Sequence, residues 1–269
     1  MNKKICLVAK NKETYFIKRL IEEVGQSEVT LFNPWSDLEI PAADVYVVRT
    51  TGVYGSDLDL MLLKSLPAER IINPLPVLNK FRSKTVQYQW MDEENFPVLP
   101  WLSLKGMDLL MVEKFFRLYP EMVVKPTIGQ GGWGVEGLTW ESFKTWKNKK
   151  GKDEDYLLQP FVKNSRELRV FFCKGIGPLV LERRTKSGIA ANFKKSGEAR
   201  AVDLPSELTP LVSGLIEKSG AFYGAMDIIL DENRPYVLEM NSVPGIEQLE
   251  QVSGKNVMLE FLKSLLCQN

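Results

Sequence analysis

Two apolar runs separated by a polar tetrapeptide form the most constraining feature of this 269-residue sequence. The runs are residues 225–230 and 235–240, and the tetrapeptide is Asp231-Glu232-Asn233-Arg234. Apolar runs that flank turn-forming residues are typical of a β-hairpin. A hairpin folded about Asn233 places Asp227 opposite Glu239. Asn241 joins Glu239 on one face, because side chains two apart on a strand share a face.

The predicted hairpin gathers oxygen-bearing side chains. Residues directly opposite each other on antiparallel strands have Cβ atoms about 5 Å apart, and like charges there destabilise the pair. A cation between Asp227 and Glu239 removes this repulsion, and two carboxylates with the amide oxygen of Asn241 are ligands that Mg²⁺ prefers. The alternative is that both carboxylates are solvated on an open face. Their apolar flanks favour a largely buried sheet, although a register slip of one residue would separate the set.

Composition limits the remaining chemistry. The 35 basic and 34 acidic residues give a net charge of +1, so neither nucleic acid nor membrane is an expected partner. No apolar run approaches the roughly 18 residues of a membrane span, and the first apolar run is too short for a signal peptide. Cys6, Cys173 and Cys267 are far apart, which argues against disulfides or a thiolate zinc site and favours a cytoplasmic protein. Histidine is absent, so carboxylates, lysines, arginines, backbone dipoles or a metal must carry any chemistry.

Residues 1–75 are predicted to form a small α/β unit. Strand and helix patterns alternate as βαβαβαβ, which is typical of a parallel, doubly wound sheet. The predicted strands are residues 4–9, 28–32, 44–49 and 70–73, and the predicted helices are 15–24 and 58–66. Residues 50–52 follow the third strand, where such sheets bind ligands, but an ordinary polar loop is the favoured interpretation. Residues 76–95 are predicted to form one long helix.

A glycine-rich segment follows the apolar strand 121–126, which contains Lys125 near its end. Residues 127–134 read TIGQGGWG, a spacing that suggests the dinucleotide-binding fingerprint. That fingerprint needs a helix to start at once, whereas residues 135–138 have a strand pattern. A loop between two strands can still place backbone N–H groups over phosphate oxygens, because glycine has no Cβ to block the approach. The alternative is a flexible hairpin tip, and the neighbouring lysine favours phosphate binding.

The rest of the chain combines helices with further strands. Helices are predicted over 107–118, 139–149, 208–220 and 253–267, and strands over 155–162, 168–173 and 178–184. The lysines of 139–149 are interpreted as a solvated helix face rather than a nucleic-acid patch. Residues 185–197 are polar and basic and are predicted to form a loop over a site. Apolar faces near Trp90, Phe115 and Trp140 fit either a core or a subunit interface, so a homo-oligomer is left open.

The order of these features resembles the ATP-grasp superfamily, in particular its RimK-like branch, the ribosomal-protein glutamate ligase type. The resemblance covers about residues 70–262. Its most specific parts are Val124-Lys125-Pro126 with the glycine loop and residues 239–245, which are similar to E-x-N-x-x-P-G. It implies an α/β (α+β) fold with a small N-terminal doubly wound unit, a central lid subdomain and a C-terminal mixed-sheet subdomain, with ATP between the last two. The implied domains are residues 1–75, 76–160 (linker helix and lid) and 161–269.

The resemblance also implies roles for individual residues. Two lysines would hold ATP phosphates, the glycine loop would close over them, and residues 159–162 would contact adenine through main-chain groups. The implied nucleotide-binding residues are Lys84, Lys125, Gly129, Gln130, Gly131, Gly132, Gly134, Gln159, Pro160, Phe161, Val162, Glu167 and Arg169. Asp227, Glu239 and Asn241 would bind Mg²⁺, expected as two ions, with Mn²⁺ as an alternative. Glu167 stands where the family more usually has aspartate.

The implied catalytic residues are Arg183, Arg184 and Asn192. Arg183 and Arg184 match arginines that face the transferring phosphate, and only one of them should point inward because they are adjacent on a strand. Asn192 lies in the basic loop, where Ala190 stands in place of the family's usual arginine. The substrate side of the site therefore departs from the family pattern more than the ATP side does.

The implied activity is an ATP-dependent carboxylate–amine ligase. A carboxylate would attack the γ-phosphate to give an acyl phosphate and ADP, and an amine would then displace phosphate to give an amide. The family's usual theme is an amino acid added to a peptide or small-molecule acceptor, and both substrates remain unidentified. A phosphotransferase on the same scaffold and a non-catalytic nucleotide-binding protein are the alternatives. Residues 185–197 contain no carboxylate that could act as a kinase base, which mildly favours the ligase.

Overall fold

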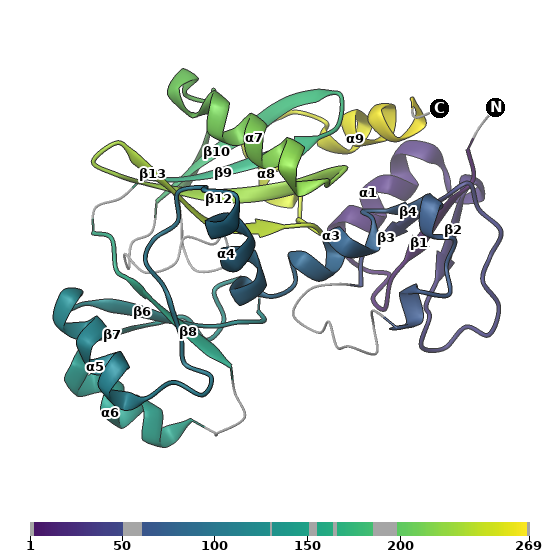
Figure 1. Cartoon of the computed structure of the whole chain (residues 1–269). Helices are drawn as coiled ribbons and strands as arrows, with labels where there is room; N and C mark the ends of the chain where they lie inside the picture. The colour runs from purple at the N-terminus through teal and green to yellow at the C-terminus, as the bar shows by residue number, and fades with distance from the viewer. Residues whose placement is uncertain are drawn as a thin grey trace.

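Three β-sheets follow one another along the chain and carry helices on their faces (Figure 1). The computed structural model describes residues 3–50, 61–129, 131–150, 155–163, 166–184 and 198–267, with the backbone alone at Arg184. One sheet is parallel and the other two are antiparallel, which confirms the predicted α+β class. Among these residues no helix is long and apolar enough to cross a membrane.

The N-terminal sheet has four parallel strands in the order β2-β1-β3-β4. Its strands are β1 (Ile5–Val8), β2 (Val29–Phe32), β3 (Val45–Val48) and β4 (Ile71–Ile72), and its helices are α1 (Tyr15–Val24) and the 3-10 helices η1 (Gln26–Glu28) and η2 (Ala68–Arg70). The predicted parallel unit is therefore confirmed. Residues 61–63 of the predicted second helix are helical, and its earlier residues lie outside the described part of the chain.

The predicted single helix over residues 76–95 is wrong. Two helices, α3 (Leu75–Lys80) and α4 (Lys84–Glu93), replace it. Ser83 has extended backbone angles and its side chain accepts a hydrogen bond from the Val86 N–H, so it is the N-cap of the second helix. Because of this break, α4 begins at Lys84.

The second sheet, at the lower left of Figure 1, is antiparallel with the order β5-β8-β6-β7. Its strands are β5 (Leu102–Ser103), β6 (Met122–Pro126), β7 (Glu136–Leu138) and β8 (Tyr156–Pro160), and α5 (Leu109–Leu118) and α6 (Trp140–Lys149) pack on it. Thr139 and Ser142 form a capping box at the start of α6. The short β5 lacks a visible sequence signal and was not predicted.

The third sheet is antiparallel with the order β11-β10-β9-β12-β13. Its strands are β9 (Arg166–Cys173), β10 (Ile176–Arg184), β11 (Glu198–Val202), β12 (Tyr223–Asp231) and β13 (Arg234–Asn241), and its helices are η4 (Ser206–Leu208), α7 (Thr209–Ser219), α8 (Glu247–Ser253) and α9 (Val257–Leu266). Neither β11 nor α8 was predicted from the sequence. The predicted β12–β13 hairpin is present.

The two faces of the third sheet have different partners. On one face, α3, α4 and α7 share a core with residues such as Val170, Met226 and Val237. On the other face, one end of the sheet shares a core with α1, α9 and the N-terminal sheet, where Phe16 and Tyr223 stack. The remaining part of that second face carries the charged residues described next.

Candidate active site

The β12–β13 hairpin closes differently from the prediction. Asp231 pairs with Arg234, so the turn consists of Glu232 and Asn233, which have φ values of +46° and +76°. The hairpin axis therefore lies between these two residues and not at Asn233. A regular ladder continued from this turn would place residue 238 opposite Asp227, and Glu239 would then point to the other face.

A β-bulge restores the predicted pairing. The register shifts between Asp227 and Ile228, Asp227 pairs with Glu239, and Leu238 is the extra residue of β13. Val237 and Met240 consequently share one core although they are three residues apart. The predicted register of the two carboxylates is confirmed, and the bulge at Leu238 is the physical reason for it.

Arginines from the neighbouring strands reach the same face. Arg169 on β9 lies opposite Asp227 in the ladder and pairs with it, with Nη1 to Oδ2 at 3.2 Å. Arg183 on β10 lies opposite Glu167 and pairs with both Glu167 and Asp227, with Nη2 to Asp227 Oδ1 at 3.0 Å. Two guanidinium groups thus surround Asp227.

Arg183 is the inward-pointing member of the predicted arginine pair. Its side chain is 7 % exposed, whereas the side chain of Arg184 lies outside the described part of the chain. Burial raises the pKa of Glu167, and the adjacent Arg183 opposes this shift without cancelling it. Asn192 and Gln130 also lie outside the described residues, so their predicted roles stay predictions.

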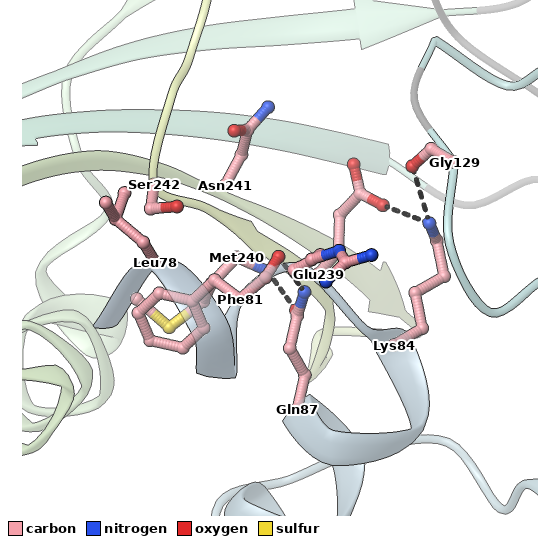
Figure 2. A pocket seen from close by; sticks show the side chains of 10 residues that line it. Leu78, Phe81, Lys84, Gln87, Gly129, Glu239, Met240, Asn241 and Ser242 are labelled. Atoms are coloured by element: carbon pink, nitrogen blue, oxygen red, sulfur yellow. Dashed lines mark hydrogen bonds and ion pairs between the residues drawn. The ribbon is translucent and has the colours of Figure 1, made fainter. Parts of the chain in front are cut away.

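Lys84 connects three elements at the first turn of α4 (Figure 2). Its Nζ donates to the Gly129 carbonyl at 2.9 Å and lies 3.5 Å from Glu239 Oε2. These groups line an open pocket with about 420 Å³ of empty space, bounded by α3, α4, the glycine loop and β13. In Figure 2, Glu239 and Asn241 project to the same side of β13. The predicted phosphate lysine therefore lies beside a predicted metal ligand.

Lys125 on β6 is the second buried lysine of the site. It is 9 % exposed, and its Nζ donates to the Tyr88 hydroxyl at 3.1 Å. Burial lowers its pKa to about 8, although Glu239, Glu167 and Asp227 act in the opposite direction. The amine is thus held close to three carboxylates in a poorly solvated place.

The glycine-rich segment is a loop between antiparallel strands, as predicted. It connects β6 to β7, which pair through Val124 and Glu136. Gly131, Gly132 and Gly134 have positive φ values. A Cβ at Gly134 would lie 2.8 Å from Pro126 Cγ, so both the backbone angle and the close approach require glycine there.

The predicted adenine hinge, residues 159–162, begins within the last two residues of β8. Gln159 is 1 % exposed, and its Oε1 lies 3.0 Å from the Tyr88 hydroxyl. The N–H of Phe161 is bonded to the Glu121 carbonyl at 2.9 Å. The Gln159 side chain is therefore an internal support, and adenine contact through the main chain of Pro160 and Val162 stays a prediction.

Comparison with known proteins decides the family. The model of the RimK-like ATP-grasp domain matches residues 107–265, more than half of the chain. The chain belongs to the RimK-like ATP-grasp family. By this membership it is an ATP-dependent carboxylate–amine ligase, as the resemblance predicted.

Individual relatives of this RimK-like protein are distant in sequence. Tetrahydromethanopterin:alpha-L-glutamate ligase of Methanocaldococcus jannaschii is 23% identical over 73% of this chain and 70% of its own length. A probable alpha-L-glutamate ligase of Shewanella halifaxensis is 24% identical over 97% of this chain, which spans only 62% of that relative. The ATP-grasp ligase PsnB, solved with a phosphomimetic variant of its minimal precursor, Mg and ADP, has a TM-score of 0.77 at 14% identity and covers 99% of this chain and 98% of its own. The last similarity shows a shared fold.

The donor set fits a magnesium ion. The described residues hold no cluster of three or more acidic, cysteine or histidine side chains for a metal, so a cation here would rely on two carboxylates and an amide oxygen. Asn241 Oδ1 accepts the Val243 N–H at 2.9 Å, which orients it and leaves its second lone pair. All three donors are oxygens, as Mg²⁺ prefers.

The sequence analysis of this RimK-like ligase missed two residues that line the pocket, Arg82 and Gln87, and the buried Tyr88 behind it. Gln87 and Tyr88 follow Lys84 by three and four residues, so helical spacing alone places all three on one face of α4. Arg82 lines the same pocket from the break between α3 and α4. The helical spacing was a usable signal for Gln87 and Tyr88, whereas Arg82 depends on a helix break that the sequence did not reveal.

Proposed function

We propose that this protein activates a carboxylate with ATP and joins it to an amine. A carboxylate oxygen attacks the γ-phosphorus and ADP leaves, which gives an acyl phosphate. The amine nitrogen then attacks the acyl carbon, inorganic phosphate leaves, and the nitrogen loses a proton to give the amide. The first step needs charge neutralised on the transferring phosphoryl group more than it needs a base.

Fixed positive charge supports this step. Lys84 and Arg183 converge on the face that carries Asp227 and Glu239, and Lys125 interacts electrostatically with the same carboxylates. We assign the two lysines to the ATP phosphates and Arg183 to the transferring phosphoryl group. The bond between Lys84 and the Gly129 carbonyl supports a phosphate-binding role for Gly129 and the following glycines, whose backbone N–H groups would face the phosphates.

Asp227, Glu239 and Asn241 would hold Mg²⁺. The ion, when bound, would supply positive charge that neutralises the charge developing on the transferring phosphoryl group. Arg169 and Arg183 orient Asp227 through the ion pairs described above. We propose Mg²⁺ as the physiological ion, with the number of ions and the use of Mn²⁺ to be measured by titration.

The names of the relatives suggest the substrates. Two of them are alpha-L-glutamate ligases, so we propose L-glutamate as the first amine to test. The carboxylate would belong to a peptide or a small molecule. Fold alone does not determine substrate, and a pool of other amino acids belongs in the same assay.

One observation carries the proposal: Lys84 joins the glycine loop to Glu239, so a phosphate loop and a metal carboxylate meet at one amine. The test measures ADP and phosphate release from ATP and Mg²⁺ with L-glutamate, pooled amino acids and short acidic peptides. The variant is Glu239→Gln, and its control is Glu260→Gln, which removes an exposed carboxylate of α9 paired only locally with Lys263.

The ligase predicts substrate-dependent release of both products, retained in Glu260→Gln and lost in Glu239→Gln. Release of ADP without free phosphate would replace the ligase by a kinase. Full activity in Glu239→Gln would remove the metal assignment while keeping the fold.

A further inference from the structure

The strand that carries Glu239 is fastened to α4 at its bulge. β13 is an edge strand of the third sheet, so one side of its backbone has no neighbouring strand. Along that side, Tyr88 donates its hydroxyl proton to the Leu238 carbonyl. Gln87 Oε1 accepts the Met240 N–H at 2.8 Å (Figure 2).

These two bonds hold the peptide groups on either side of Glu239. The Leu238 carbonyl belongs to the peptide before Glu239, and the Met240 N–H belongs to the peptide after it. A bulged residue is left out of the regular ladder, so groups outside the ladder fix the local backbone. Before the bulge, the Pro97 carbonyl accepts the Val237 N–H at 2.8 Å. Tyr88 and Gln87 come from one helix and bracket the bulge.

Both side chains are themselves immobilised. Tyr88 is fully buried, and its oxygen also accepts from Lys125 Nζ and lies 3.0 Å from Gln159 Oε1. Gln87 is 3 % exposed and donates from Nε2 to the Phe81 carbonyl at 2.9 Å. Tyr88 and Gln87 together form a clamp on the bulge. This clamp is rigid, because the polar contacts described for both side chains are made inside the protein.

We infer that Tyr88 and Gln87 are positioning residues for the metal site. They hold the bulge that turns the Glu239 carboxylate to the face of Asp227. Without the clamp, the bulge loses its side-chain supports and the two carboxylates no longer keep one fixed separation. This inference rests on the proposed metal role of Asp227 and Glu239, and it adds two residues that act through the backbone on either side of Glu239.

The test measures ADP binding by calorimetry as a function of Mg²⁺ concentration. Tyr88→Phe removes only the hydroxyl. Gln87→Met removes both the acceptor of the Met240 N–H and the donor to the Phe81 carbonyl, with little change of shape. The matched control is Tyr46→Phe, because the buried Tyr46 donates its hydroxyl to the Pro41 carbonyl in the N-terminal unit. Thermal unfolding of all variants monitors general destabilisation.

We expect Tyr88→Phe and Gln87→Met to raise the Mg²⁺ concentration for half-maximal tightening of ADP by about tenfold, the lower end for loss of an outer-shell partner. ADP affinity without metal should change far less in Gln87→Met, which leaves the contact between Lys125 and Tyr88 intact, and Tyr46→Phe should match wild type in both. A midpoint within twofold of wild type in both clamp variants would overturn the inference, as would an equal shift in Tyr46→Phe. If wild-type ADP binding does not respond to Mg²⁺, the proposed metal site is wrong and the inference falls with it.

Discussion

Replacing Lys125 by methionine should stabilise the protein while it disables the site. Burial lowers the pKa of Lys125 from 10.5 to about 8. One pKa unit corresponds to about 1.4 kcal/mol, so keeping this amine charged in the folded protein at neutral pH costs on the order of 3 kcal/mol. Methionine keeps the aliphatic stem without the charge. Allowing for the lost bond to Tyr88, we expect the free energy of unfolding to rise by about 1–3 kcal/mol.

The stability that Lys125→Met gains over wild type should decrease as the pH rises. Between pH values of about 8 and 10.5 the folded protein binds fewer protons at Lys125 than the unfolded chain does, so wild-type stability rises with pH in this window. Below a pH of about 8 the amine is charged in both the folded and the unfolded state, so the folded protein bears the full cost of burying that charge. The advantage of Lys125→Met should therefore be constant near neutral pH and shrink by about 2 kcal/mol at a pH of about 9.5.

Urea unfolding followed by tryptophan fluorescence, at about pH 7 and about pH 9.5, measures this difference directly. Subtracting wild type cancels the other titrating groups. Lys163→Met is the control, because Lys163 is exposed and its ion pair among the described residues is with the surface residue Glu121. This variant should show neither a gain in stability nor a pH dependence. The reasoning is refuted if Lys125→Met is less stable than wild type at neutral pH, or if its advantage does not shrink at high pH. Turnover should fall about 100-fold or more, as for loss of one transition-state donor.

Two further substitutions test the supports of the site. The side chain of Asn73 is fully buried and bonds to four backbone groups, at Phe222, Tyr223 and Ser242 beside the ends of β12 and β13. Asn73→Ala should therefore lower the free energy of unfolding by about 2–4 kcal/mol, measured by denaturation beside the exposed Asn79→Ala. A loss equal to that of Asn79→Ala would contradict the structural role of Asn73. Gly134→Ala places a Cβ against Pro126 at a positive φ, which strains the loop backbone by about 1–3 kcal/mol, so ATP affinity should fall by about tenfold or more. Gly177→Ala is the control, because nothing lies within 4 Å of the added Cβ, and it should bind ATP as wild type does. Equal affinities in the two variants would argue against a rigid glycine loop.

The sequence predicted the carboxylate pairing correctly through two offsets that cancel. Folding the hairpin about Asn233 misplaces the turn by half a residue, and the bulge at Leu238 supplies the missing half. Neither the position of the turn nor the bulge has a clear sequence signal. Glu232 is not a residue type that favours a positive φ, and Leu238 is one apolar residue among several. The alternation of Asp227, Glu239 and Asn241 with buried neighbours was nevertheless enough to indicate a shared face.

Tertiary contacts explain what the sequence could not show. The break before Lys84 depends on one N-cap serine inside a continuous helical pattern. The choice of Arg183 as the inward arginine depends on its register opposite Glu167, and strand alternation only says that one of two neighbours must point inward. The positioning role proposed for Tyr88 depends on a backbone carbonyl 150 residues away in the sequence, which a local pattern cannot indicate.

The charges of the site favour entry of the metal together with nucleotide. Among the described residues around it, Lys84, Lys125, Arg169 and Arg183 are basic, whereas Glu167, Asp227 and Glu239 are acidic. Burial raises the pKa of Glu167, which weakens the acidic side further. A bare dication would add to this excess of positive charge and would have to displace guanidinium groups from Asp227. The magnesium complex of ATP carries net negative charge, so its phosphates would attract Lys84 and Arg183, and the carboxylates proposed as metal ligands would then be released to hold the ion.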